Sequence, residues 1–232
     1  MITTAIIVAA GSSRRMGFDK LMAPLAGKPV IVHSLRAFEG CDDIDDVIIV
    51  AREERIEAIK ELVAAEKIRK VSQVVAGGAE RHLSVWIGLK AVGAETDYIA
   101  IHDGARPLTT PRLISKCLKL AVEQGAACCG SIIPDTVKRA SDDNVVTESV
   151  ERSGLWAMQT PQIFSASLIM QAYAGLIASS EAVTDEVSAV QRIGKKIALL
   201  RNEEWNFKIT SPADLDLAEE VMANRQRSGR RK

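Results

Sequence analysis

The chain has 232 residues, of which 47% are hydrophobic and 26% are charged, as is typical of one globular α/β domain. The 30 Lys and Arg residues balance the 30 Asp and Glu residues, which argues against a general basic surface for binding nucleic acid. No apolar run is long enough to span a membrane, and the first residues lack the charged start of a signal peptide. The four cysteines form no C-x-x-C pair, so we expect a cytoplasmic protein without structural zinc.

Short apolar runs alternate with longer amphipathic segments, which predicts βαβ units and a mostly parallel sheet flanked by helices. In the first part of the chain, strands are expected at 5–9, 47–50, 71–75, 98–101 and 126–133. The helices expected between them are 29–38, 53–65, 81–92 and 111–124. Together these elements predict a single α/β domain that covers residues 1–232.

The pattern changes between residues 134 and 158, where short polar and β-branched runs surround the turn signal S-D-D-N at 141–144. This pattern predicts a hairpin arm that projects from the α/β body. Further helices are expected at 165–179 and 185–192, a strand at 197–200, and a last helix with Ser211 as its N-cap and Pro212 at its first position. The basic end of the chain, residues 225–232, is expected to be a solvated tail.

The first expected strand opens into the loop G-S-S-R-R-M-G-F-D-K at residues 11–20. Ligands of open α/β sheets bind beyond the carboxyl ends of the strands, and glycines let backbone N–H groups approach an anion closely. Arg14, Arg15 and Lys20 can add charge-assisted hydrogen bonds to phosphate. The loop lacks the second glycine of the dinucleotide fingerprint and the lysine that follows the second glycine of a P-loop. Taken alone, it is equally consistent with a surface turn that carries solvated arginines.

Two further loops favour a polyphosphate site. The run G-G-A-E-R-H-L-S at 77–84 follows the third expected strand and places Arg81 and Ser84 at a glycine turn that enters a helix. The run H-D-G-A-R-P at 102–107 ends the fourth strand with Asp103 and Arg106. Because Mg²⁺ in proteins takes one or two carboxylates together with phosphate oxygens, Asp103 is a candidate magnesium ligand. A lone Asp after a strand can also be a turn or cap residue.

Seven sequence blocks occur in the order V-A-A-G-x-x-R-R-M-G…K, G-G-A-E-R-x-x-S-V, H-D-G-A-R-P, D-T-V-K, G-L-W-A-M-Q-T-P-Q, T-D-E-V-S-A and N-F-K-I-T. Together they resemble the 2-C-methyl-D-erythritol 4-phosphate cytidylyltransferase family, from Ala5 to the final helix. The resemblance implies a nucleotidyltransferase fold whose β-arm, at about 134–158, embraces a second subunit in a homodimer. It also implies transfer of a cytidylyl group from CTP to 2-C-methyl-D-erythritol 4-phosphate, with release of pyrophosphate, in isoprenoid precursor biosynthesis.

The resemblance also implies roles for individual residues at the nucleotide. Six residues match the positions that contact CTP, and these are Ala9, Ala10, Gly11, Gly78, Arg81 and Ser84. Three cations match the catalytic positions that neutralise the phosphates and the leaving pyrophosphate, and these are Arg15, Lys20 and Lys208. Asp103 matches the carboxylate that binds Mg²⁺. The acceptor phosphate is already an anion, so no strong general base is required, and the cations would act by electrostatic stabilisation and positioning.

The residues implied at the acceptor are Asp103, Arg106, Thr136, Arg152, Thr160 and Thr184. Three of them, Thr136, Arg152 and Thr160, match positions that the family's arm supplies to the partner subunit. The chain departs from the family pattern at Asp19, where many members have Pro before the loop lysine. It departs again at Trp205, where an acidic residue is common.

Three other functions are alternatives to this one. A ribitol 5-phosphate cytidylyltransferase would share the CTP site and differ around the arm, and the T-P-Q and T-D-E runs favour methylerythritol phosphate over it. A non-catalytic nucleotide-binding module would be expected to lose Asp103, Lys20 or Lys208, and all three are present. An NAD-dependent oxidoreductase lacks its fingerprint. We also expect His102 to be a buried strand-end residue with a hydrogen bond, and the T-D-E run at 184–186 to cap a helix.

Overall fold

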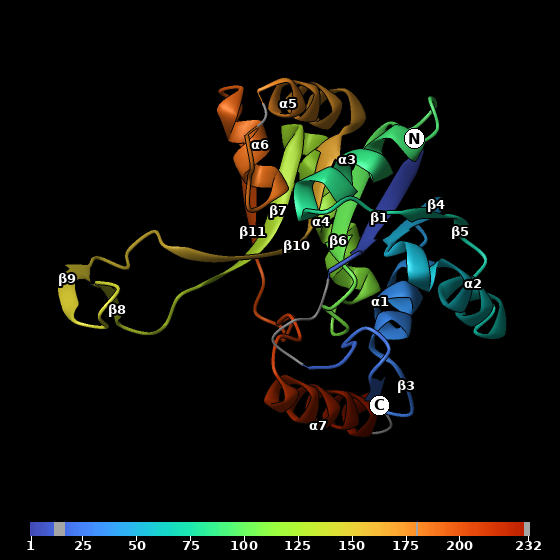
Figure 1. The fold of residues 1–232 in the computed structure, drawn as a ribbon, viewed down its shortest axis with the longest axis horizontal. Helices are drawn as coiled ribbons and strands as arrows, with labels where there is room; N and C mark the ends of the chain where they lie inside the picture. Colours follow the sequence, from blue (N-terminus) through green and yellow to red (C-terminus); the bar gives the residue numbers. More distant parts are fainter. Residues whose placement is uncertain (12–16, 180, 230–232) are drawn as a thin grey trace.

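A seven-stranded sheet, in the order β11-β7-β10-β6-β1-β4-β5, forms the centre of the computed structural model, which describes residues 1–11, 17–179 and 181–229 (Figure 1). The strands that run parallel to one another are β1 (Thr3–Ala9), β4 (Asp46–Ala51), β5 (Val71–Ala76), β6 (Tyr98–Asp103), β7 (Ala126–Ile132) and β11 (Ala198–Arg201). Only β10 (Trp156–Ser165), among the described strands of this sheet, is antiparallel to its neighbours. The prediction of a mostly parallel sheet flanked by helices is therefore confirmed.

Helices cover both faces of the sheet (Figure 1). One face carries α1 (Val30–Glu39), the 3-10 turn η2 (Glu53–Arg55) with α2 (Ile56–Ala65), and α4 (Pro111–Gln124). The other face carries α3 (Arg81–Ala91), α5 (Ala166–Ala178) and α6 (Glu186–Arg192). Ile6 and Ile7 are both fully buried, one against each layer of helices, which explains why β1 is a continuous apolar run rather than an alternating one. None of the described helices is long and apolar enough to cross a membrane.

A small separate layer lies beyond the end of the sheet, where the last helix, α7 (Pro212–Gly229), packs near the short strands β2 (Pro24–Leu25) and β3 (Lys28–Pro29) (Figure 1). Leu25, Leu108, Ile209 and Val221 share an apolar cluster that holds this layer together. Because Ile209 belongs to the cluster, the layer also fixes the neighbouring Lys208. The two-residue strands β2 and β3 were not predicted, since so short a run leaves no periodic pattern.

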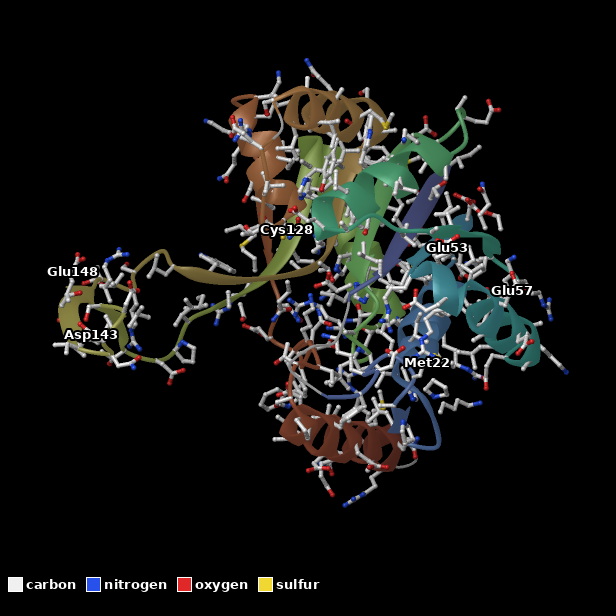
Figure 2. The ribbon with its side chains drawn as sticks, viewed as in Figure 1. Met22, Glu53, Glu57, Cys128, Asp143 and Glu148 are labelled. Carbon is white, nitrogen blue, oxygen red and sulfur yellow. The ribbon has the colours of Figure 1, made fainter. Side chains whose placement is uncertain are left out.

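The hairpin of β8 (Val137–Ala140) and β9 (Val146–Val150) stands well away from the body of the molecule (Figure 1). Asp143 and Glu148 lie near its far end (Figure 2). Val145 and Val146 are 61% and 62% exposed. A two-stranded hairpin is marginally stable in water by itself, so this arm would gain from a surface that covers it.

The strand β10 was not predicted, because residues 134–158 were expected to form the arm and no element was expected at 159–164. Residues 156–158 instead begin β10, which pairs with β7 on one side and β6 on the other. The polar run Q-T-P-Q at 159–162 interrupts the apolar pattern, and Pro is uncommon inside a central strand. The pairing with β7 is irregular between Met158 and Gln162, which is how the strand accommodates this run.

Gly88 lets α3 approach the sheet closely. A Cβ atom at this position would lie 2.7 Å from Ile6 Cγ2 and 2.9 Å from Val50 Cγ2. Gly88→Ala is therefore expected to lower the free energy of unfolding by about 1–3 kcal/mol through overpacking, as measured by urea denaturation. Gly175→Ala on α5 is the matched control, because its Cβ would meet no atom within 4 Å. The control should be neutral or stabilising, and an equal loss in both variants would contradict the packing argument.

Candidate active site

A pocket of about 350 Å³ opens at the carboxyl ends of β1, β5 and β6. The chain passes from β1 outward through β4 and β5 and then returns to β6 on the other side of β1, and ligands of open α/β sheets bind at such a switch in strand order. The residues that line the pocket are Val8, Ala10, Gly11, Lys20, Leu21, Gly78, Ala79, Glu80, Arg81, Ser84, Asp103, Ala105 and Lys208. Ala9 is buried at the end of β1, and the predicted Arg15 lies outside the described residues.

The glycine turn at 77–78 brings two of the predicted loops into contact. A Cβ on Gly77 would lie 2.6 Å from the Cβ of Ala10, so only glycine allows the first loop and this turn to lie so close. The Ser84 hydroxyl accepts a hydrogen bond from Gly78 N at 3.1 Å and donates to Glu80 O at 3.0 Å. Ser84 is nearly inaccessible to solvent, so its hydroxyl shapes the pocket wall by fixing the turn.

Asp103 lies at the centre of a cluster of cations. Its Oδ1 is 3.2 Å from Arg81 Nε, and its Oδ2 is 3.0 Å from Lys208 Nζ and 3.6 Å from Arg106 Nε. Burial alone would raise the pKa of Asp103, but the charges of Arg81, Lys208 and Arg106 hold it well below its usual range. Asp103 is therefore a carboxylate at neutral pH, and it holds three cations that come from α3, from the loop after β6 and from the segment before α7.

A buried hydrogen-bond chain holds Asp103 from behind. The Thr160 hydroxyl accepts from Asp103 N at 3.1 Å and donates to His102 Nδ1 at 3.0 Å, while His102 Nε2 donates to Arg106 O at 3.3 Å. Burial lowers the pKa of His102 to about 3, so the ring is neutral and can accept at Nδ1. The expectation that His102 is a buried, hydrogen-bonded strand-end residue is confirmed. Thr160 supports Asp103 through the interior of the protein.

A second hollow, of about 300 Å³, adjoins the first and shares Arg81, Asp103 and Lys208 with it. Its remaining lining residues are Arg106, Met158, Gln159, Thr160, Gln162, Thr184 and Asp185. The structure thus brings together four of the six predicted acceptor residues. The other two lie on the exposed arm segment, where Thr136 is exposed and the Arg152 guanidinium donates to the carbonyl oxygen of Pro134.

The lysine of the first loop is held from two sides. Lys20 Nζ donates to Ile209 O at 2.9 Å, which places it beside the Lys208 segment. Asp19, the residue that departs from the family pattern, lies 3.3 Å from Arg52 Nη2 and 3.0 Å from Arg55 Nε through Oδ2. These ion pairs anchor the loop next to Lys20, so the departure at Asp19 has a structural explanation.

Glu186 forms an ion pair with Arg81 in this region, and this contact was not predicted from the sequence. Asp185 caps α6 as expected, because its side chain accepts from Ser188 N at 3.0 Å. The sequence predicts for Glu186 only the start of the helix, yet its carboxylate is fully buried and lies 2.6 Å from Arg81 Nη1. The two residues are 105 positions apart, so no local pattern could have revealed the pair.

A sequence profile of the family described as 2-C-methyl-D-erythritol 4-phosphate cytidylyltransferase matches residues 3–224. The chain belongs to this family. A relative of that name from Bacillus cytotoxicus is 41% identical over 221 residues, which cover 94% of this chain and 97% of the relative. One from Lachnospira eligens is 38% identical over 94% of this chain and 97% of its own length. A crystal structure of 4-diphosphocytidyl-2C-methyl-D-erythritol synthase from Anaerococcus prevotii has a TM-score of 0.84 at 29% identity, over 96% of each chain.

The side chains of this cytidylyltransferase family member fit a magnesium ion only if phosphate oxygens of a bound substrate supply further ligands. Within the described ranges, no group of three or more His, Cys, Asp or Glu side chains could hold a metal ion. Asp103 supplies one ionised carboxylate at the border of the two pockets, and one carboxylate with phosphate oxygens is a usual set for Mg²⁺.

Two threonines of the acceptor hollow are expected to have different roles. Thr160 supports Asp103 from behind, whereas Thr184 is expected to contact the acceptor. Thr160→Val leaves the Asp103 N–H without its acceptor, so we expect a loss of about 1–3 kcal/mol in unfolding free energy together with a lower kcat. Thr184 is exposed, so Thr184→Val should leave stability unchanged and raise only the acceptor KM. Thermal unfolding and steady-state kinetics on both variants, with Thr160→Ser as the conservative control, test this. A Thr160→Val protein with wild-type stability would contradict it.

Proposed function

We propose that this protein transfers the cytidylyl group of CTP to 2-C-methyl-D-erythritol 4-phosphate, which yields 4-diphosphocytidyl-2-C-methyl-D-erythritol and pyrophosphate for isoprenoid precursor biosynthesis. The observation that carries the proposal is the group Arg81, Asp103 and Lys208, which borders two adjoining pockets. One pocket has the glycine-rich loops suited to a nucleoside triphosphate. The other has the cationic and hydroxyl side chains suited to a polyol phosphate.

In the proposed reaction, an oxygen of the acceptor phosphate attacks the α-phosphorus of CTP. A new P–O bond forms, the bond between the α-phosphorus and the bridging oxygen breaks, and pyrophosphate leaves with that bond's electron pair. The difficulty is that two anions must meet. Lys208 borders both pockets and Lys20 lies beside its segment, so these two lysines would supply positive charge where the negative charges converge.

The remaining residues position the reactants. The backbone of Ala9, Ala10 and Gly11 would follow the triphosphate, together with Arg15. The turn held by Gly78 and Ser84 would receive the cytosine and ribose. Arg106 and Thr184 would hold the acceptor, and fixing both substrates in line lowers the barrier by removing their freedom to reorient.

We further propose Mg²⁺ as the cofactor, held by Asp103 and the phosphate oxygens. The ion would neutralise phosphate charge when bound. The ionised state of Asp103 supports this proposal, because its low pKa keeps it a ligand at neutral pH.

We also propose that the protein is a cytoplasmic homodimer in which each arm completes the partner's acceptor site. Exposed Val145 and Val146 on the arm, and the distance of the arm from the body in Figure 1, support this arrangement. Thr136 and Arg152 do not line the acceptor hollow of their own chain, as expected if they serve the partner's. Thr160, which was assigned to the partner with them, instead lies on β10 and lines the hollow of its own chain. All four cysteines are free and buried, in keeping with a reducing compartment.

Pyrophosphate release with CTP and Mg²⁺ tests the proposed function. The acceptors would be 2-C-methyl-D-erythritol 4-phosphate and ribitol 5-phosphate in parallel, with ATP, GTP and UTP as control nucleotides. Release that requires both CTP and the methylerythritol acceptor supports the proposal. Release with ribitol phosphate alone would keep the chemistry and change the pathway, and release with no pair would indicate a non-catalytic nucleotide-binding module.

A further inference from the structure

A fully buried carboxylate, Glu186, lies behind the pocket at the start of α6. Its Oε1 is 2.6 Å from Arg81 Nη1 and 3.1 Å from the hydroxyl of Tyr173, and its Oε2 is 3.1 Å from Arg81 Nη2. A buried charge is tolerated only when it is paired and hydrogen-bonded, and this one is met on both oxygens. Since its side chain is 0% exposed, Glu186 has no access to a substrate.

Arg81 is thereby fixed between two carboxylates. Its two Nη atoms face Glu186, while its Nε donates to Asp103 Oδ1 at 3.2 Å. Burial would lower the pKa of Arg81, but Glu186 and Asp103 together raise it above its usual value, so the guanidinium stays charged. A planar guanidinium held along two edges cannot rotate without breaking one set of contacts.

Glu186 also affects Asp103, because both carboxylates share the positive charge of Arg81. Asp103 already faces Lys208 and Arg106, and it would become the sole carboxylate partner of Arg81 among these residues if Glu186 were neutral. Glu186 contacts both Nη atoms of Arg81, so Asp103 shares Nη2 with it, at 3.2 Å from Oδ1, and only Nε is left to Asp103 alone. The carboxylate expected to act at the phosphates is therefore less fully occupied by its neighbours.

Glu186 also joins the two walls of the site. Arg81 begins α3 on the side of the nucleotide pocket, while Thr184 and Asp185, which precede α6, line the acceptor hollow. Gln162 of β10 fixes this corner, because it donates to Asp185 Oδ2 at 3.2 Å and accepts from Val187 N at 3.1 Å. In Figure 1, α3, α5 and α6 cover the same face of the sheet, so the Arg81–Glu186 pair spans the helices of one layer.

We propose that Glu186 is a positioning residue, which holds the Arg81 guanidinium at the border of the nucleotide and acceptor pockets and ties the acceptor wall to α3. The inference rests on the proposed function, because the reaction that Arg81 serves is the proposed cytidylyl transfer. Glu186 acts entirely through Arg81, so its effect on catalysis should disappear when Arg81 is absent.

A double-mutant cycle tests this dependence. Glu186→Gln keeps the shape of the side chain and removes its charge, and it is expected to lower kcat/KM for both substrates by about 10- to 100-fold, as for partners that orient the ligands of a metal site. In an Arg81→Gln background, the same change should alter kcat/KM by less than about 2-fold. Single-turnover assays with excess enzyme keep weak activity measurable. The matched control is Glu181→Gln, whose carboxylate pairs with Arg192 on the surface; it should change nothing.

Two results would overturn the proposal: wild-type kcat/KM in Glu186→Gln, or an equal loss in the Arg81→Gln background, since the latter would mean a general structural role. Loss of a buried partner can prevent folding. In that case Glu186→Asp, which keeps the charge and shortens the side chain, decides the matter: a folded Glu186→Asp protein with wild-type kcat/KM would equally overturn it.

A measurement independent of activity separates this proposal from the proposed function. The Nε–Hε signal of Arg81, assigned by its loss in Arg81→Lys, should exchange slowly with water in the wild type. It should exchange faster in Glu186→Gln and stay slow in Glu181→Gln. A wild-type protein that releases no pyrophosphate would defeat the proposed function alone, whereas unchanged exchange in Glu186→Gln would defeat the positioning role alone.

Discussion

Lys208→Met is expected to reduce kcat by about 100- to 1000-fold, the range found when one preorganised donor to a developing negative charge is removed. Lys208 Nζ lies 3.0 Å from Asp103 Oδ2 and borders both pockets. Methionine keeps most of the side chain's volume and removes its charge. Because no other described lysine borders both hollows, neighbouring lysines should not compensate.

The fold should survive this substitution, because Asp103 keeps its contacts with Arg81 and Arg106. Lys195→Met, on the exposed surface between α6 and β11, is the matched control and should retain wild-type kcat. The measurement is pyrophosphate release at saturating CTP and acceptor, with a thermal unfolding curve for each protein. A folded Lys208→Met enzyme that keeps more than about a tenth of wild-type kcat would remove Lys208 from the chemical step.

The same variant has a pH signature. The folded-state pKa of Asp103 is depressed, so its contribution to stability is present above the unfolded pKa of about 3.9 and is lost as the pH falls through the lower folded value. Removing Lys208 raises the folded pKa and shrinks this contribution. Lys208→Met should therefore be less stable than the wild type near neutral pH, and the difference should narrow in acid. The difference should stay constant down to about pH 4 and narrow only below it, so urea denaturation from pH 7 down to pH 2 measures it. A difference that widens in acid would contradict the assignment.

The limits of sequence-based prediction are clear at particular residues. Asp103 and Lys208 could be placed at the site because each belongs to a motif with its own local pattern. The parallel strands were predictable because burial on both faces of the sheet makes them continuous apolar runs. The antiparallel β10 was missed because its polar Q-T-P-Q run conceals a central strand.

Contacts between segments that are distant in the sequence could not be predicted, for a different reason. Glu186 meets Arg81 only because α3 and α6 cover the same face, and Thr160 meets Asp103 only because β10 lies beside β6. Such pairs depend on strand order, which no local periodicity encodes. The same holds for Asp19, whose partners Arg52 and Arg55 follow β4 and lie just before and within the helix expected at 53–65. Residues with a motif were found, and the contacts through which distant residues support them were not.

Mixing two variants that are each impaired at low acceptor concentration is expected to restore activity if the arm serves the partner subunit. Asp103→Asn removes the carboxylate from the body of the chain. Arg152→Ala removes a cation from the base of the arm, whose side chain lies outside the acceptor hollow of its own chain. In a mixed dimer, one site combines an intact body with an intact arm. An equal mixture should therefore recover about a quarter of wild-type sites once the subunits have exchanged at random.

Acceptor well below its KM should be used, since Arg152→Ala is expected to raise the acceptor KM more than the CTP KM. Arg139→Ala mixed with Asp103→Asn is the matched control, because Arg139 is an exposed arm cation that pairs with Glu148 within the arm. Arg139→Ala alone should be active, so mixing should add nothing. Native mass spectrometry with one isotope-labelled chain establishes that mixed dimers have formed. If mixed dimers are present and the Asp103→Asn and Arg152→Ala mixture stays inactive, each site is built from one chain, and the arm serves assembly without entering the acceptor site.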